Sequence, residues 1–239
     1  MLIPMLEFIH RERSQYRALA VLSAGCLVLT GLLQYLDARI FQRVIGGINP
    51  LLAATIVVAL GFVLLSWLLS RGGFSIYRSE NRKGLLYACG LATLFGVIVI
   101  PIDLLIRFPA DINVPLPASL LFYPVVGFFA EILFHVLPLS LLLIVLFAVF
   151  RSVRQTGIVW LGIAAVAMIE PVYQTLWMVS LDRYPVWAVA VDALHVFAIN
   201  LAQLIIFRRY DFVSMITLRW VYYLFWHIGW GSMRLDILF

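Results

Sequence analysis

Lysine is almost absent from this 239-residue chain, which has one, Lys83, beside sixteen arginines. Charged residues of either sign make up only 12% of the sequence, against 64% hydrophobic residues, and the mean hydropathy is +1.04. One soluble core cannot bury so much apolar surface, which excludes a soluble protein. The arginines lie almost wholly between the apolar runs, where they would face lipid headgroups. The net charge of +5 therefore does not indicate a nucleic-acid partner.

Cysteine is scarce as well. Cys26 and Cys89 lie singly within apolar runs, which favours small hydrophobic side chains over a disulfide or a metal site. The first segment, residues 1–17, lacks a small-residue cleavage site after a basic start, so it is not typical of a signal peptide. We interpret it as an amphipathic stub at the membrane interface, with His10 among the headgroups.

Seven apolar runs are long enough to span a bilayer. They cover residues 18–36, 50–70, 84–106, 118–150, 158–181, 186–207 and 212–231. The sequence thus predicts an all-α fold, a polytopic bundle of about seven transmembrane helices in which residues 1–239 form a single integral membrane domain. Membrane lipid is the first partner to expect.

Basic residues alternate in number from loop to loop. Eleven lie in the loops on the side of the N-terminus and five on the other side, with Arg234 among the five; Arg219, inside the last run, belongs to neither set. The positive-inside rule then places the N-terminus in the cytoplasm and the C-terminus outside.

The fourth run carries an unusual polar pair. Its 33 residues at about 1.5 Å each make roughly 50 Å against a hydrocarbon core of roughly 30 Å, so we expect a kink near Pro124 or Pro138, or a tilted helix. Between these prolines, Glu131 and His135 are four residues apart and share a helix face. An ionisable pair inside a membrane span is a candidate functional site.

Other apolar runs also contain polar residues: Asp103, Glu170, Tyr173, Gln174, Asp192, His195, Asn200, Gln203, Arg219, Tyr223 and His227. Counted along the helices at about 1.5 Å per residue, five acids and histidines fall at similar depths toward the outer leaflet: Glu131, His135, Glu170, His195 and His227. We expect these five to converge on one site. Pro171, directly after Glu170, should loosen the helix at the carboxylate.

Carboxylates and imidazoles in a water-filled pocket can activate water and stabilise an oxyanion, as hydrolysis requires. The candidate catalytic residues are Glu131, Glu170, His195 and His227. The same donor types suit a divalent metal such as zinc, although nothing in the sequence demands a cofactor. The candidate metal ligands are His135, Glu170, His195 and His227.

The remaining polar residues have structural interpretations. We interpret Arg219 as a side chain that snorkels or pairs with a carboxylate. Asp103 and Asn200 are interpreted as structural or interfacial residues, and Gln174 and Gln203 as contacts between helices.

Three stretches resemble motifs of the CAAX protease and bacteriocin-processing (CPBP) family of intramembrane proteases. Residues 130–135 are similar to its EExxxR motif, with Glu131 at the second glutamate, alanine at the first and histidine at the arginine. Residues 166–170, or alternatively 191–195, resemble FxxxH, and residues 227–231 resemble HxxxN with glycine at the asparagine. The resemblance implies a CPBP-like core over residues 118–231, in a prokaryotic inner or plasma membrane, acting on a peptide or membrane-protein substrate.

The leading hypothesis is a divergent CPBP-like intramembrane endopeptidase that hydrolyses a peptide bond with water activated by Glu131 and Glu170, with or without a metal. The changed motif residues favour an alternative, a non-catalytic immunity or partner-binding protein of the same fold. A proton- or metal-coupled transporter that uses the same residues as a relay is a third hypothesis.

Overall fold

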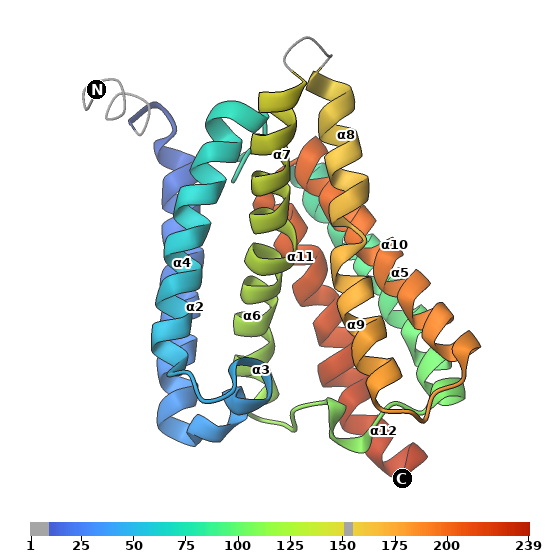
Figure 1. The fold of residues 1–239 in the computed structure, drawn as a ribbon. Coiled ribbons are helices and arrows are strands. Elements are labelled where there is room, and N and C mark those ends of the chain that lie inside the picture. Colours follow the sequence, from blue (N-terminus) through green and yellow to red (C-terminus); the bar gives the residue numbers. More distant parts are fainter. Residues whose placement is uncertain (1–9, 151–154) are drawn as a thin grey trace.

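Long helices that alternate in direction make up the structure (Figure 1). The computed structural model describes residues 10–150 and 155–239, and no strand occurs among them. The longer helices are α2 (Arg13–Asp37), α4 (Pro50–Trp67), α5 (Arg82–Ile106), α6 (Ser119–Ala130), α7 (Leu137–Val149), α8 (Gln155–Val166), α9 (Ile169–Ser180), α10 (Val186–Arg209), α11 (Phe212–Tyr223) and α12 (Gly231–Leu238). The shorter elements are α3 (Gln42–Ile45), 3-10 turns at Ala38–Phe41 and Ala110–Ile112, and π-helical turns at Leu68–Gly72, Glu131–Val136 and Leu224–Trp230.

In the described part of the chain, six helical runs are long and apolar enough to cross a membrane. They are Arg13–Asp37, Pro50–Gly72, Arg82–Ile106, Ser119–Val149, Gln155–Ser180 and Val186–Arg209. A seventh continuous helical run, residues 212–238, is not among these six. Apolar side chains on the outside of the bundle, such as Val21, Leu86 and Leu105, are each 72% exposed, as a lipid-facing surface requires. The protein is an integral membrane protein, and the predicted all-α polytopic bundle is confirmed.

Helix α2 begins at one end of the bundle, and the C-terminus lies at the other (Figure 1). Helix α2 starts at Arg13, so the last part of the predicted interfacial stub belongs to the first long helix. Residues 1–9 lie outside the described residues, and His10 is exposed. Both cysteines are free, as predicted; Cys26 is buried, whereas Cys89 lies on the exposed face of α5.

Helix α5 packs against α10 and α11, and its buried face carries a stripe of small side chains. Gly84, Ala88, Ala92 and Gly96 recur every four residues, and all four are buried. Small residues allow close approach of helices in a membrane, where lipid is as apolar as the side chains and packing drives association. The approach is close at both ends of the stripe: an added Cβ would lie 2.6 Å from Oγ of Ser214 at Gly84 and 2.6 Å from Cβ of Phe225 at Gly96.

The fourth span is one helical run of 31 residues, Ser119–Val149, which agrees with the apolar run at 118–150 in the sequence. The irregularity expected near a proline takes the form of the π-helical turn Glu131–Val136, which ends two residues before Pro138. Proline has no N–H to donate to the preceding turn, which favours a local change in hydrogen bonding there. Wide turns of this kind often occur at functional sites, and this one holds both Glu131 and His135.

The fifth span is interrupted, as expected from Pro171. Helix α8 ends at Val166 and α9 begins at Ile169, so Glu170 and Pro171 lie in the first turn of a new helix. Proline is well tolerated there because the first N–H groups of a helix have no partner within it. A carboxylate is favoured at the same place by the helix dipole. The break therefore fixes Glu170 at a helix N-terminus in the interior of the bundle.

Candidate functional site

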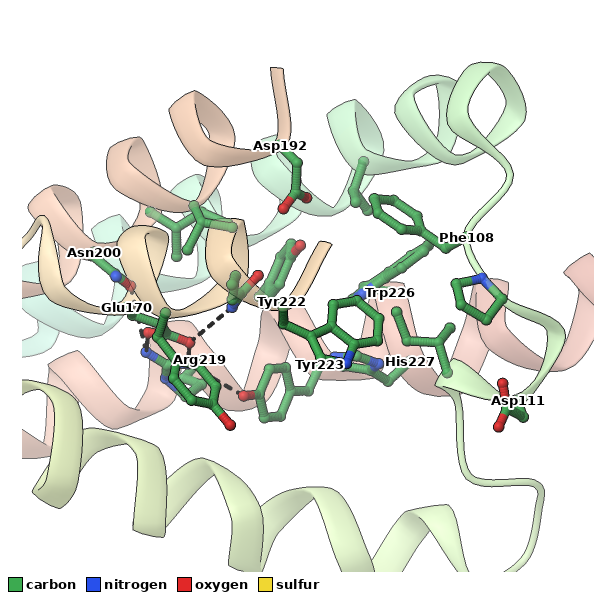
Figure 2. Close-up of a pocket in the computed structure, with 18 residues that line it drawn as sticks. Phe108, Asp111, Glu170, Asp192, Asn200, Arg219, Tyr222, Tyr223, Trp226 and His227 are labelled. Carbon is green, nitrogen blue, oxygen red and sulfur yellow. Dashed lines mark hydrogen bonds and ion pairs between the residues drawn. The ribbon is translucent and has the colours of Figure 1, made fainter. Parts of the chain in front are cut away.

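A buried arginine on α11, Arg219, lies between two buried glutamates from other helices. Its Nε donates a hydrogen bond to Oε1 of Glu131 over 2.5 Å. Its Nη1 and Nη2 donate to Oε1 and Oε2 of Glu170 over 3.0 and 2.8 Å (Figure 2). None of the three side chains is more than 8% exposed. The interpretation that Arg219 pairs with a carboxylate is confirmed, and it pairs with a second one too.

Amide and phenol groups surround the same guanidinium. Gln203 on α10 donates to Oε1 of Glu131, and its own Oε1 accepts from Nη2 of Arg219 over 3.2 Å. Oδ1 of Asn200 lies 3.5 Å from Nη2, and the hydroxyl of Tyr223 accepts from Nη1 over 3.2 Å. A guanidinium presents its donors in a rigid fork, so these acceptors fix its position. The interpretation of Gln203 as a contact between helices is confirmed.

His135 lies beside Glu131 in this cluster. Its Nδ1 lies 2.9 Å from Oε2 of Glu131 without the alignment of a hydrogen bond, and within the described residues its Nε2 has no hydrogen-bond partner. Two carboxylates and one guanidinium carry a formal charge of −1, on side chains that are at most 8% exposed.

The other two predicted site histidines have different surroundings. Nε2 of His195 lies 3.3 Å from the hydroxyl of Tyr222, and its ring meets Phe95 edge on. His227 lies in the π-helical turn Leu224–Trp230, where its Nδ1 is 2.7 Å from Oδ1 of Asn113 and its ring stacks on Tyr123. Both imidazoles thus pack among aromatic rings and polar side chains outside the arginine cluster.

The structure therefore divides the five residues expected to share one site. Glu131, His135 and Glu170 meet around the guanidinium, whereas His195 and His227 lie outside this cluster, although His227 lines a cavity together with Glu170 and Arg219. Similar depth in the bilayer does not determine which way each helix face points, and that is why the prediction failed for the last two. In the described part of the chain, no three His, Cys, Asp or Glu side chains lie close enough together to hold a metal ion. The proposed metal ligands accordingly form no cluster: His135, Glu170, His195 and His227.

A cavity of about 420 Å³ lies beside the arginine cluster (Figure 2). Its walls come from α5, α9, α10, the helical run from α11 onward, and the loop that follows α5. Glu170, Arg219, Asn200 and Tyr223 form one polar part of the lining. Glu131 is fully buried and does not line the cavity. Of the two predicted catalytic acids, Glu170 alone faces this space.

A second buried ion pair holds the loop that borders the cavity. Arg234 on α12 donates through Nε and Nη2 to Asp103 over 2.7 and 2.8 Å. It also donates to the carbonyl groups of Phe108 and Pro109, both of which line the cavity. Asp103 is structural, as interpreted. The assignment of Arg234 to an outer loop was wrong, because its side chain is fully buried in this pair.

Sequence reasoning identified the members of the arginine cluster as intramembrane polar residues but left several of them outside the site. Arg219, Asn200, Gln203 and Tyr223 were not among the candidate site residues. One signal could have placed the arginine: a permanent cation deep inside a span requires carboxylate partners. Tyr223 lies one turn further along the same helix face, so it could then have been predicted to contact Arg219.

Comparisons of the chain with protein-family models, with curated proteins and with solved structures give no match. The resemblance to the CPBP family stays a prediction. Within the described residues, His227 of the stretch compared with HxxxN bonds to Asn113 and not to either glutamate. Arg219 and Tyr223, which have the same spacing of four, lie beside the glutamates instead.

Proposed function

We propose that the protein is a non-catalytic binding protein of the membrane, whose cavity receives a ligand or a segment of a partner. The observation that carries this proposal is the engagement of both glutamates by Arg219. A carboxylate that activates water must face the water and take up its proton. Both oxygens of Glu170 accept from the guanidinium, whose positive charge stabilises the ionised carboxylate and opposes uptake of a proton, and Glu131 does not line the cavity.

In this proposal Glu131 and Glu170 stabilise the structure, and the cavity binds the ligand or partner segment. Glu131, Arg219 and Glu170 join the π-helical turn, α11 and α9 at one point, so they hold that end of the cavity in shape. A volume of about 420 Å³ falls within the range typical of sites for small molecules. The proposed setting is a prokaryotic inner or plasma membrane with the N-terminus in the cytoplasm, and the partners are lipid and a peptide or membrane protein.

Native mass spectrometry of the chain purified in mild detergent tests the binding proposal. We expect a species of constant extra mass, bound one to one. Val196 lines the cavity on α10, so Val196→Phe should fill part of the space and remove most of that species. Val191→Phe is the matched control, because Val191 lies on the same helix, is 40% exposed and does not line the cavity. A wild-type chain with no adduct, or an adduct that survives Val196→Phe, would contradict the proposal.

An intramembrane endopeptidase is the second candidate, and one observation favours it. Glu170 faces the cavity beside Arg219 and Tyr223, which could offer donors to an oxyanion once a substrate displaced Glu170 from the guanidinium. Proteoliposomes containing the chain and a set of transmembrane peptides distinguish the two functions. The binding proposal expects no cleavage products by mass spectrometry. Cleavage that is lost in Glu170→Gln, but kept when the exposed Glu80 is changed to glutamine, would establish the protease instead.

A further inference from the structure

Asp192 on α10 is a buried carboxylate to which the described part of the chain offers no counterion. It is 8% exposed, lines the cavity, and points into it (Figure 2). Among residues 10–150 and 155–239, no hydrogen bond or ion pair reaches its carboxylate. An ionisable side chain inside a membrane is costly unless something compensates it, so such residues commonly mark a binding site or an ion pathway.

The other acids buried inside the membrane helices each have a cation. Asp103 pairs with Arg234, and Glu131 and Glu170 share Arg219. Asp192 is the exception within the described residues. The contrast indicates that the charge of Asp192 is compensated by a group of another molecule.

The cavity around Asp192 has the character of a site for a positive charge. Of the described residues that line it, three are acids, and Arg219 is the one permanent cation, already engaged by two glutamates. Much of the remaining wall is aromatic: Phe108, Tyr173, Trp177, Tyr222, Tyr223 and Trp226. Aromatic faces attract cations through their quadrupole, most strongly where water is excluded.

We propose that this cavity binds an organic cation, an ammonium group whose charge lies at Asp192 and whose body packs against the aromatic wall. This inference rests on the proposed binding function and names its ligand class. A bare metal ion fits less well, because it needs several donors and no three acids or histidines cluster in the described chain. The ammonium group can come from a soluble amine or from a lipid headgroup.

Choline and its uncharged isostere 3,3-dimethyl-1-butanol test the charge directly. Calorimetric titration into the chain in phosphatidylglycerol nanodiscs should show choline binding about 10- to 100-fold more tightly than the alcohol. Asp192→Asn should abolish that preference. Asp182→Asn removes the same charge from an exposed loop position outside the cavity, and it should keep the preference. Nanodiscs that contain phosphatidylcholine distinguish the sources: lost choline binding there identifies a headgroup, and unchanged binding identifies a soluble amine.

Equal affinity for the two ligands, no measurable binding of choline, or an unchanged preference in Asp192→Asn would each overturn the inference. The ligand comparison uses the wild-type chain, so it decides the matter even where the variant does not fold. These outcomes leave the proposed binding function standing if the mass-spectrometric adduct is still lost in Val196→Phe. Absence of that adduct is the separate failure of the proposed function.

Discussion

Arg219 compensates the charges of two buried glutamates, Glu131 and Glu170. Two carboxylates are tolerable in the bilayer interior because one guanidinium bonds to both, through three different nitrogens. Removing one member of a buried charge network destabilises a protein more than replacing the whole network with uncharged residues. The remaining charges keep their desolvation cost and lose the opposite charge that compensated it. At the scale of the residue, we therefore expect Arg219 to stabilise the fold as long as both glutamates are present.

Arg219→Met should destabilise the protein by about 3–5 kcal/mol, because it leaves two buried carboxylates close together without a cation. The melting temperature of the protein in detergent, followed by size-exclusion chromatography, measures the effect. Arg209→Met is the matched control, since Arg209 is exposed at the end of α10 and should change little.

The charge-free combination of Arg219→Met with Glu131→Gln and Glu170→Gln should recover much of the loss, because no uncompensated charge remains. If Arg219→Met alone melts like the wild-type protein, the network does not stabilise the fold.

Residue types in the cluster could be read from the sequence, but their pairing could not. Arg219 lies 88 positions from Glu131 and 49 from Glu170, and Arg234 lies 131 from Asp103. No local pattern encodes contacts over such distances. Arg234 was assigned to a loop for a related reason. A charged residue near the end of an apolar run is normally counted with the following loop, and the sequence does not show that Asp103 is its buried partner.

At the scale of the element, irregular backbone lies where the polar residues are. The π-helical turn holds Glu131 and His135, the break between α8 and α9 presents Glu170, and a second π-helical turn holds His227. Freed backbone groups at membrane depth are tolerated only where protein surrounds them or a cavity is near. Prolines in the sequence predicted the first two irregularities, whereas no proline lies in the turn that holds His227.

Gly96→Ala should destabilise the contact between α5 and the helical run after α11 by about 1–3 kcal/mol. The added methyl group would lie 2.6 Å from Cβ of Phe225, which cannot move away without a shift of the backbone. Gly90→Ala is the matched control on the same helix, because nothing lies within 4 Å of its added Cβ. It should be neutral or stabilise by up to about 1 kcal/mol. Thermal melting of both variants provides the measurement, and equal effects would refute close packing at Gly96.

At the scale of the whole molecule, the cavity lies toward the end where the C-terminus lies. The loop after α5, which contributes Phe108 and Pro109 to the lining, is at that end (Figure 1). Hydropathy predicted the spans well, because crossing a bilayer demands about twenty apolar residues wherever it occurs. Faces and depths were predicted less well, since they depend on how each helix rotates and tilts against its neighbours.

Labelling of single cysteines in intact cells tests the orientation that the basic residues predict. Glu80 lies in the loop before α5, and Asp182 in the loop before α10, at opposite ends of the bundle; both are exposed. A membrane-impermeant maleimide should label Asp182→Cys and leave Glu80→Cys unlabelled, because arginine-rich loops stay in the cytoplasm. Cys89→Ala removes the exposed native thiol, and permeabilised cells should label both positions. The opposite labelling pattern would place the N-terminus outside and the cavity near the cytoplasm, where a ligand would have to come from within the cell.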